Sequence, residues 1–264
     1  MLYQPYEIEI SQRYLKSVLS AAKEPICILG AWAVYMTVNE SFSRDQGRNY
    51  LGSRDIDLGF HLNENATEKE LRNSDFNSVI QVLERSGFEF VGFRLVKHFH
   101  TETRRELKGA EARKTPSYET FELYVDPIVD AVPKLSKKVF GFVPIDEPML
   151  SRVFIQKEAK TTALFGKRVL LPLPKVLLAA KIKSVVSRDK EYKRIKDIAD
   201  IYALAWYSKV KLYELMTELS SIVPKKEVSS TLRAFKKEEL ARASMALGVD
   251  AVQVQRVMDE LTSA

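Results

Sequence analysis

The feature that most limits the possible folds of this chain is a change of hydrophobic pattern near Pro172 and Pro174. After these prolines, from Lys175 to the end, apolar residues recur only at helical spacing. Before them, short apolar runs typical of strands alternate with amphipathic segments. The sequence therefore predicts an α/β (α+β) protein, with a mixed sheet and flanking helices in residues 1–172 and a helical domain in residues 173–264.

The expected elements can be placed by residue range. Strands are expected at 26–29, 54–62, 88–100 and 121–129, with short β segments at 139–143 and 151–173 and a turn at Gly166-Lys167. Helices of the first half are expected at 10–23, 31–38 and around 76–83, with polar loops at 39–52 and 101–117. Helices of the second half are expected at 175–187, 191–207, 211–222, 226–247 with a break, and 250–262.

Composition narrows the setting of the protein. Lys and Arg number 41 against 35 Asp and Glu, and this net charge of +6 permits nucleic acid or nucleotide partners without requiring them. The single cysteine, Cys27, excludes an internal disulfide and fits a reducing cytoplasm. The longest apolar run, residues 26–36, is shorter than the roughly 20 residues that cross a bilayer, and the polar N-terminus is unlike a signal peptide. We therefore expect a soluble cytoplasmic protein with no membrane partner.

Two aspartates, Asp55 and Asp57, are the strongest chemical signal in the sequence. Side chains two apart on a strand point to the same face, where two carboxylates repel each other unless a cation lies with them. Hard oxygen ligands favour magnesium or manganese as that cation. Upstream, a turn at Gly30 opens a helix whose N–H groups can hold a phosphate. The pattern suggests a metal-dependent phosphate-transfer site; the alternative is that Asp55 simply pairs with Arg54 or a nearby lysine.

A third carboxylate is expected on a neighbouring strand, because two-metal sites need more ligands than two aspartates supply. Asp126 is the best candidate because it ends a hydrophobic run, where a charge is otherwise costly. Asp130 and Glu122 share its parity and are the next candidates. The alternative is that Asp126 only caps a turn before Pro127.

Several motifs surround these aspartates and follow them later in the chain. The first is Gly30-Ala31-Trp32-Ala33-Val34, followed by Ser53-Arg54-Asp55-Ile56-Asp57-Leu58. The later ones are Leu173-Pro174-Lys175-Val176-Leu177-Leu178-Ala179-Ala180-Lys181, then Arg188, then Lys196-Asp197-Ile198-Ala199-Asp200-Ile201-Tyr202-Ala203-Leu204. In this order the motifs resemble those of the polymerase-β-like nucleotidyltransferase superfamily, and more narrowly those of the AbiEii toxin family of type IV toxin–antitoxin systems. They cover residues 26–62 and 172–205, with Asp126 between them.

This resemblance implies a nucleotidyltransferase fold and a reaction that moves a nucleoside monophosphate from an NTP to an acceptor hydroxyl, with Mg²⁺ or Mn²⁺ as cofactor. Asp55, Asp57 and Asp126 would be the catalytic metal ligands. The other matched positions would contact the nucleotide, and these are Gly30, Ala31, Ser53, Lys181, Arg188, Asp197 and Asp200. The acceptor would be tRNA, another RNA or a protein, and a toxin of this kind would have a cognate antitoxin.

Two positions depart from the family pattern. Ala31 stands where a second glycine is usual, and Leu51 stands where an arginine is usual, with Arg48 as a displaced substitute. These departures keep open a second hypothesis, a catalytically degenerate nucleotide- or RNA-binding protein. A purely structural or partner-binding protein is a third. The donor base, the acceptor and the oligomeric state are not determined by the sequence.

Positive charge is concentrated in two clusters that could contact phosphates. The first cluster is Arg94, Lys97, Arg104, Arg105, Lys108, Arg113 and Lys114. The second cluster is Lys181, Lys183, Arg188, Lys190, Lys193, Arg194 and Lys196. The alternative is that both are ordinary solvated surfaces. Because the second cluster flanks the matched helical motif, it is the better candidate for contact with nucleotide or RNA.

Overall fold

The computed structural model describes residues 2–22 and 25–263. Contacts between residues divide the chain into two compact units, and each is described by itself. The sheet unit consists of Tyr3–Leu29 and Ser53–Leu171. The helical unit combines Gly30–Gly52 with the chain from Pro172 onward. Residues 30–52 therefore group with the C-terminal helices. The division into two domains at 172/173, expected from the sequence, stays a prediction.

The sheet unit is built on one mixed sheet, which confirms the α/β fold class. Its strands are β1 (Ile26–Ile28), β2 (Ile56–Phe60), β3 (Glu89–Val91), β4 (Arg94–His100), β5 (Glu106–Leu107), β6 (Thr120–Val129), β7 (Ile145–Asp146), β8 (Ala159–Leu164) and β9 (Lys167–Pro172). In the described residues the strand order is β3-β4-β6-β2-β1-β9-β8, with β5 paired to β4 and β7 to β6. β2 runs parallel to β6 and antiparallel to β1, and β4 runs antiparallel to β6.

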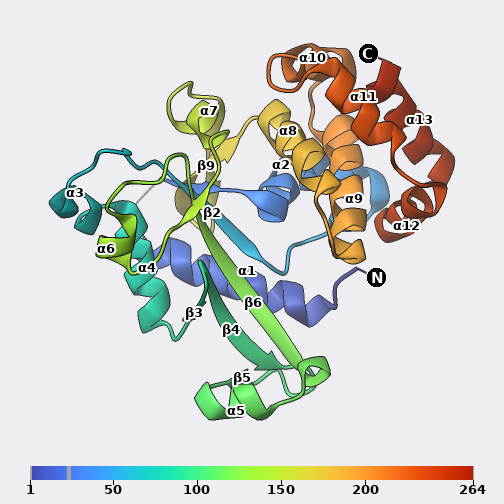
Figure 1. Ribbon diagram of the computed structural model, residues 1–264. Coiled ribbons are helices and arrows are strands. Elements are labelled where there is room, and N and C mark those ends of the chain that lie inside the picture. Colours follow the sequence, from blue (N-terminus) through green and yellow to red (C-terminus); the bar gives the residue numbers. More distant parts are fainter. Residues whose placement is uncertain (1, 23–24, 264) are drawn as a thin grey trace. The chain divides into compact units, whose positions relative to one another are not determined.

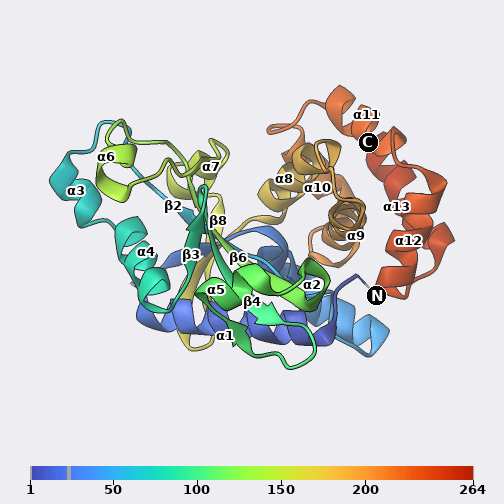
Figure 2. The same cartoon turned by 60° about the horizontal axis from the view of Figure 1, so that its bottom comes forward.

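Helix α1 (Pro5–Ala21) packs against β6 and against α4 (Asp75–Arg85) in the sheet unit (Figure 2). The other helices of this unit are α3 (Glu68–Arg72), α5 (Gly109–Lys114), α6 (Ser136–Phe140) and α7 (Leu150–Phe154), with a 3₁₀ turn, η1 (Ser117–Glu119). Tyr6 and Tyr14 of α1 contact the rings of Phe121 and Phe99. Because side chains alternate along a strand, the residues one position away on β4 and β6 face the opposite side of the sheet. That second face carries the polar residues of interest.

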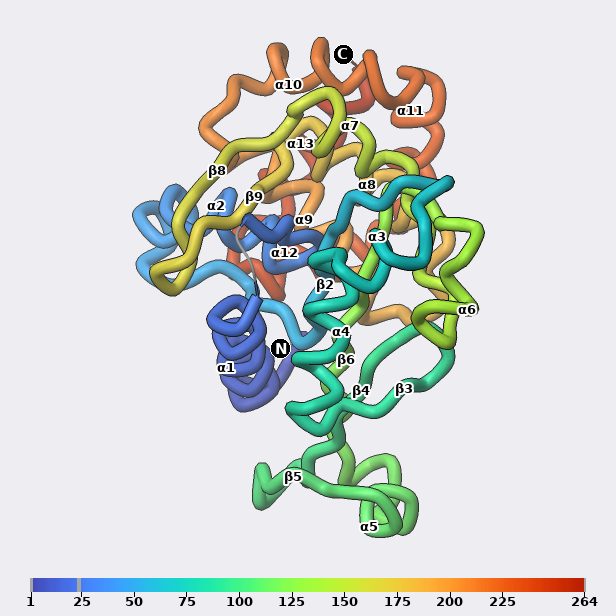
Figure 3. Tube along the Cα trace, turned by 90° about the vertical axis from the view of Figure 1, so that its left-hand side faces the viewer, coloured from blue at the N-terminus to red at the C-terminus, as the bar shows by residue number. Residues whose placement is uncertain are grey.

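Two expected loops contain regular structure. Residues 101–117 form β5 and α5 at the tip reached by β4 and β6 (Figure 3). Residues 39–46 continue the helix that begins at Gly30, because Phe42 extends the fully buried positions Val34 and Val38 by one more turn. The helical pattern is hard to see in the sequence because the residues around Phe42 are polar. Of the β segments expected at 139–143 and 151–173, the first is not a strand and begins with the end of α6, whereas the second contains α7 at its start and then β8 and β9, joined at the expected turn.

The helical unit agrees closely with the helical periodicity of the sequence (Figure 1). Its helices are α2 (Gly30–Gln46), α8 (Pro174–Val186), α9 (Glu191–Tyr207), α10 (Leu212–Leu219), α11 (Lys225–Arg233), α12 (Lys237–Leu247) and α13 (Ala251–Ser263). α9 is the central helix and contacts α2, α8, α10, α12 and α13. Pro174 at the first turn of α8 starts the bundle, since its fixed φ suits a helix N-terminus. Within the described residues, none of the helices has both the length and the apolar character needed to cross a bilayer.

Candidate active site

Three predicted carboxylates come together in the sheet unit. The parallel pairing of β2 and β6 places Asp57 directly beside Asp126. Asp55 lies in a bend just before β2. Ser53 shapes this bend, because its hydroxyl donates to the backbone carbonyl of Asp55 at 2.7 Å and accepts from the Asp55 N–H at 3.2 Å. Ser53 is buried, so its observed role is to position Asp55; its contact with a triphosphate stays a prediction.

Arg94, at the start of β4, is bound to one of these carboxylates. Its Nε and Nη2 donate to the two oxygens of Asp126 at 2.6 and 2.7 Å, which is the bidentate geometry of a strong ion pair. Its guanidinium also stacks on the ring of Tyr124, 3.9 Å from the centroid. Burial opposes the charge of Arg94, but its hydrogen bonds and charge attraction to Asp126, and the charges of Asp55 and Asp57, raise its pKa above the ordinary value.

The strand residues next to this pair are also polar. The Tyr124 hydroxyl donates to Glu122 Oε2 at 2.6 Å, and burial together with this carboxylate raises the pKa of Tyr124. Glu122, one of the alternatives to Asp126, faces His98 of β4, with 3.6 Å between carboxylate and imidazole. The polar face of the sheet therefore runs from the aspartates through Arg94 and Tyr124 to Glu122 and His98.

The other alternative, Asp130, lies just beyond the end of β6. Its carboxylate accepts from the Leu62 N–H at 3.0 Å and contacts Nδ1 of His61 at 2.5 Å. Asp130 is buried, whereas the His61 side chain is half exposed. Asp130 therefore fixes the segment that follows β2, four residues along the strand from Asp57.

As ligands of a divalent cation, Asp55, Asp57 and Asp126 are incompletely arranged in this structure, and that role stays a prediction. The donor atoms are suitable, since carboxylate oxygens are the preferred ligands of magnesium and manganese. Among the residues that the structure describes, however, no three Asp, Glu, His or Cys side chains are grouped so that they could hold a metal ion. Both oxygens of Asp126 are bonded to Arg94 instead. The geometry is that of carboxylates around an arginine.

The remaining charged residues of the matched motifs form a buried network inside the helical unit. Lys181 of α8 lies 2.6 Å from Asp197 and 2.7 Å from Asp200, both on α9. Arg188 Nε donates to Asp197 at 2.6 Å. Asp200 also accepts from Tyr50, at 2.7 Å, and pairs with Lys196. The network thus joins α8 and α9 to the segment that follows α2.

Burial and charge set the pKa values in this network. Burial disfavours the charged form of Lys181, but Asp197 and Asp200 outweigh it and raise the Lys181 pKa. Burial likewise disfavours a charged Asp197, yet Lys181 and Arg188 lower the Asp197 pKa. For Lys196 burial prevails over the attraction of Asp200, so its pKa is lowered. Lys181 is only 7% exposed, and in this structure its ammonium is paired with these two carboxylates. The contacts with a triphosphate predicted for Lys181, Arg188, Asp197 and Asp200 stay predictions.

The predicted phosphate-binding turn also belongs to the helical unit. Gly30 has a positive φ of 56° where α2 begins, a conformation that favours glycine. Ala31 is buried in the first turn of α2. Arg48, the displaced substitute for the family arginine, donates to the carbonyl of Leu247 at 2.5 Å and so caps the end of α12. Arg48 is therefore held at the end of α12, within the helical unit, and its role as a substitute for the family arginine stays a prediction.

Much of the charge in the two basic clusters is paired. In the first cluster Arg94, Lys97, Arg104, Arg105 and Lys108 all make ion pairs, for example Arg105 with Glu111 at 2.5 Å. In the second cluster Lys181, Arg188, Arg194 and Lys196 are paired. Net positive charge available to phosphates is thus lower than the residue counts indicate. RNA contact through either cluster stays a prediction.

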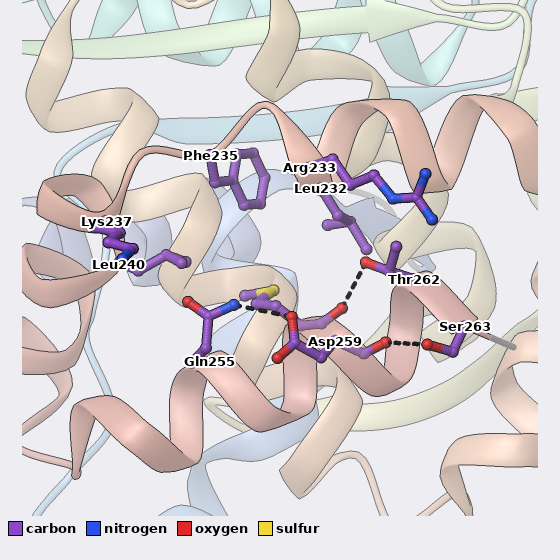
Figure 4. A pocket seen from close by; sticks show the side chains of 10 residues that line it. Leu232, Arg233, Phe235, Lys237, Leu240, Gln255, Asp259, Thr262 and Ser263 are labelled. Carbon is purple, nitrogen blue, oxygen red and sulfur yellow. Dashed lines mark hydrogen bonds between the residues drawn. The ribbon is translucent and has the colours of Figure 1, made fainter.

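A pocket of about 480 Å³ lies among α11, α12 and α13 (Figure 4). Its lining combines apolar side chains such as Phe235 and Leu240 with polar ones such as Gln255 and Asp259, which are hydrogen-bonded to each other at 2.9 Å. None of the site residues expected from the sequence lines this pocket. It is a depression within the bundle, separate from the residues that carry the predicted chemistry.

Sequence reasoning missed the roles of Arg94, Tyr124 and Tyr50. In the sequence Arg94 belongs only to a basic cluster, because its partner Asp126 is 32 residues away in the chain. The pairing of β4 with β6, which includes Leu95 opposite Val125, is the information that reveals it. A hairpin prediction that aligned these two strands from their hydrophobic alternation would have provided that signal.

Comparison with solved structures finds chains of similar structure. The chain is similar to an antigenic nucleotidyltransferase-like protein from Paracoccidioides brasiliensis, with 20% sequence identity over 86% of this chain and 93% of that one and a TM-score of 0.39. No protein-family model matches the chain, and no curated protein matches it.

Proposed function

We propose that this protein is a nucleotidyltransferase that moves a nucleoside monophosphate from an NTP to an acceptor hydroxyl. The acceptor hydroxyl loses its proton to solvent as its oxygen forms a bond to the α-phosphorus, the bond from that phosphorus to the oxygen of the β-phosphate breaks, and pyrophosphate leaves. The observation that carries the proposal is the pairing of β2 with β6, which places Asp57 beside Asp126 with Asp55 close by. Clustered carboxylates on one sheet face are costly for folding and are typical of sites with charged ligands.

Further parts of this proposal rest on the sequence resemblance. They are a requirement for Mg²⁺ or Mn²⁺, the AbiEii toxin family with a cognate antitoxin, and tRNA, another RNA or a protein as acceptor. The basic cluster at Arg94–Lys114 is consistent with an RNA acceptor, because ion pairs as exposed as Arg105–Glu111 are weak and can exchange for phosphate.

The test is incubation with each α-³²P-labelled NTP, magnesium and total cellular RNA, followed by a denaturing gel. Wild-type protein should label RNA, or a polypeptide if the acceptor is protein. The Asp55→Ala/Asp57→Ala variant should label neither while keeping its melting temperature within a few degrees. The control is Asp146→Asn, since Asp146 is an exposed aspartate of β7 in the same sheet. Equal labelling by the double variant would refute the assignment of these carboxylates.

A second function is favoured by one observation, the bidentate Arg94–Asp126 pair. A carboxylate bound in this way suits a nucleotide- or RNA-binding protein that has lost catalysis. This candidate predicts an NTP-dependent rise in melting temperature with no pyrophosphate release in any divalent metal. Release of pyrophosphate that depends on Asp57 would eliminate it.

A further inference from the structure

We infer that Arg94 is the resident cation of the carboxylate cluster and competes with divalent metal ions for Asp126. The inference concerns the same carboxylates as the proposed function. It assigns Arg94 a role as a positioning residue, since it acts by controlling what Asp126 can bind. The inference rests on two observations that disagree. Carboxylate oxygens are suited to a divalent metal ion, yet in this structure an arginine binds Asp126 where a metal ion would be expected.

The side chains of Asp126 and Tyr124 together hold Arg94. Two hydrogen bonds of 2.6 and 2.7 Å fix its guanidinium on Asp126. The Tyr124 ring lies against the guanidinium, 3.9 Å from the Arg94 Cζ atom to the centroid. The side chains of Arg94 and Asp126 are only 25% and 12% exposed, so water screens the pair weakly. An arginine held in this way does not give up its carboxylate to a dilute cation without a compensating contact.

The charges of the neighbouring aspartates also favour Arg94 at this position. Asp55 and Asp57 add their charges to the field that stabilises protonated Arg94. Removal of the guanidinium would therefore leave several carboxylates near one another without this positive charge. Asp57 and Asp126, paired across β2 and β6, would then favour a bound cation, and oxygen ligands select a hard divalent one. Loss of Arg94 should thus create a metal site where the wild-type protein has an ion pair.

The experiment measures Mn²⁺ binding to the full chain without nucleotide, from the EPR signal of free Mn²⁺ and from the melting temperature. Arg94→Met should bind Mn²⁺ at least about tenfold more tightly than wild type, as expected for removal of one nearby positive charge. Its melting temperature should fall without metal and recover with Mn²⁺, because a ligand that binds the folded state stabilises it. Arg94→Met/Asp126→Asn should lose the gained affinity.

Arg54→Met is the matched control. Arg54 is 23% exposed, lies 3.4 Å from Glu7 and stacks on Phe121 at 5.0 Å, so it resembles Arg94 in burial and in contacts but has a different carboxylate partner. It should gain much less Mn²⁺ affinity than Arg94→Met. If Arg94→Met does not fold, Arg94→Lys tests the same point, since lysine keeps the charge but loses the bidentate fork and should gain affinity partially.

Equal Mn²⁺ affinity of wild type and Arg94→Met would overturn the inference, as would a gain that persists without Asp126. Absence of Mn²⁺ binding by a folded Arg94→Met variant would also overturn it. None of these results decides the proposed transferase activity, which the labelling assay with Asp55→Ala/Asp57→Ala tests separately. A failure of labelling together with metal uptake by Arg94→Met would leave the inference intact and refute the proposed function.

Discussion

At the residue scale, Lys181 shows how a motif lysine can serve the interior of the protein. Its ammonium lies between Asp197 and Asp200, and all three side chains are buried. A buried ion pair adds modest net stability, but removal of one partner leaves uncompensated charge, which is expensive. The same arrangement explains why Tyr50, Lys196 and Arg188 converge on these two carboxylates.

Replacement of Lys181 should therefore destabilise the protein strongly. We expect Lys181→Met to lower the free energy of unfolding by about 3–5 kcal/mol, because Asp197 and Asp200 lose a shared partner. Lys183→Met, at an exposed position of the same helix, should change it by less than about 0.5 kcal/mol. Urea unfolding of the three proteins measures the difference. Equal stability of both variants would contradict a structural role for Lys181.

Acid should weaken the same network. The pKa of Asp197 is lower in the folded protein than its ordinary value, so its contribution to stability is present above the unfolded pKa of about 3.9 and is lost as the pH falls through the folded pKa. Unfolding free energies measured from about pH 5 downward should decline below about pH 4. Asp197→Asn should start from a lower stability and decline less steeply over this range.

At the element scale, the end of α12 depends on one glycine and one arginine. Gly248 has a φ of 60° at the helix terminus, where left-handed backbone favours glycine. A β-carbon at this position would lie 2.7 Å from Nη2 of Arg48, which donates to the Leu247 carbonyl. A substitution of Gly248 thus combines backbone strain with displacement of the Arg48 guanidinium from its hydrogen bond to Leu247.

Gly248→Ala should cost more stability than Gly47→Ala. Gly47 follows α2 with a φ of 67°, and a β-carbon there would meet no other atom within 4 Å. Its substitution therefore measures backbone strain alone, about 1–2 kcal/mol. The excess at Gly248 should shrink in Gly248→Ala/Arg48→Ala, because the clashing guanidinium is gone. Thermal unfolding of these variants is the measurement, and Arg48→Ala is the reference for the double substitution. Identical losses of stability in Gly248→Ala and Gly47→Ala would exclude a role for Arg48.

At the scale of the whole molecule, neither compact unit is continuous in sequence. Residues 30–52 lie between two segments of the sheet unit, yet they pack in the helical unit. Phe42 contacts the ring of Tyr207, with 5.2 Å between centroids, and Asp45 accepts from the Tyr207 hydroxyl at 2.7 Å. These contacts supply part of the surface on which α9 is buried.

A fragment of residues 173–264 should therefore not fold cooperatively alone, because α9 lacks the partners supplied by α2 and Tyr50. Fusion of residues 30–52 to this fragment through a flexible Gly/Ser linker should restore a cooperative thermal transition. Circular dichroism of both fragments is the measurement. A cooperative transition of the short fragment, at the temperature of the fusion, would instead support residues 173–264 as an autonomous domain.

The sequence by itself determined the helices after Pro174 and the core strands, because hydrophobic periodicity reflects which face of each element is buried. It also singled out Asp55 and Asp57 from their spacing of two residues, although Asp55 lies in the bend before β2. Only the tertiary structure decided that Asp57 lies beside Asp126, that Arg94 binds Asp126, and that Lys181 is buried between two aspartates. These pairings join residues 16 to 69 positions apart in the chain, so they depend on strand register and helix packing, which local patterns do not specify.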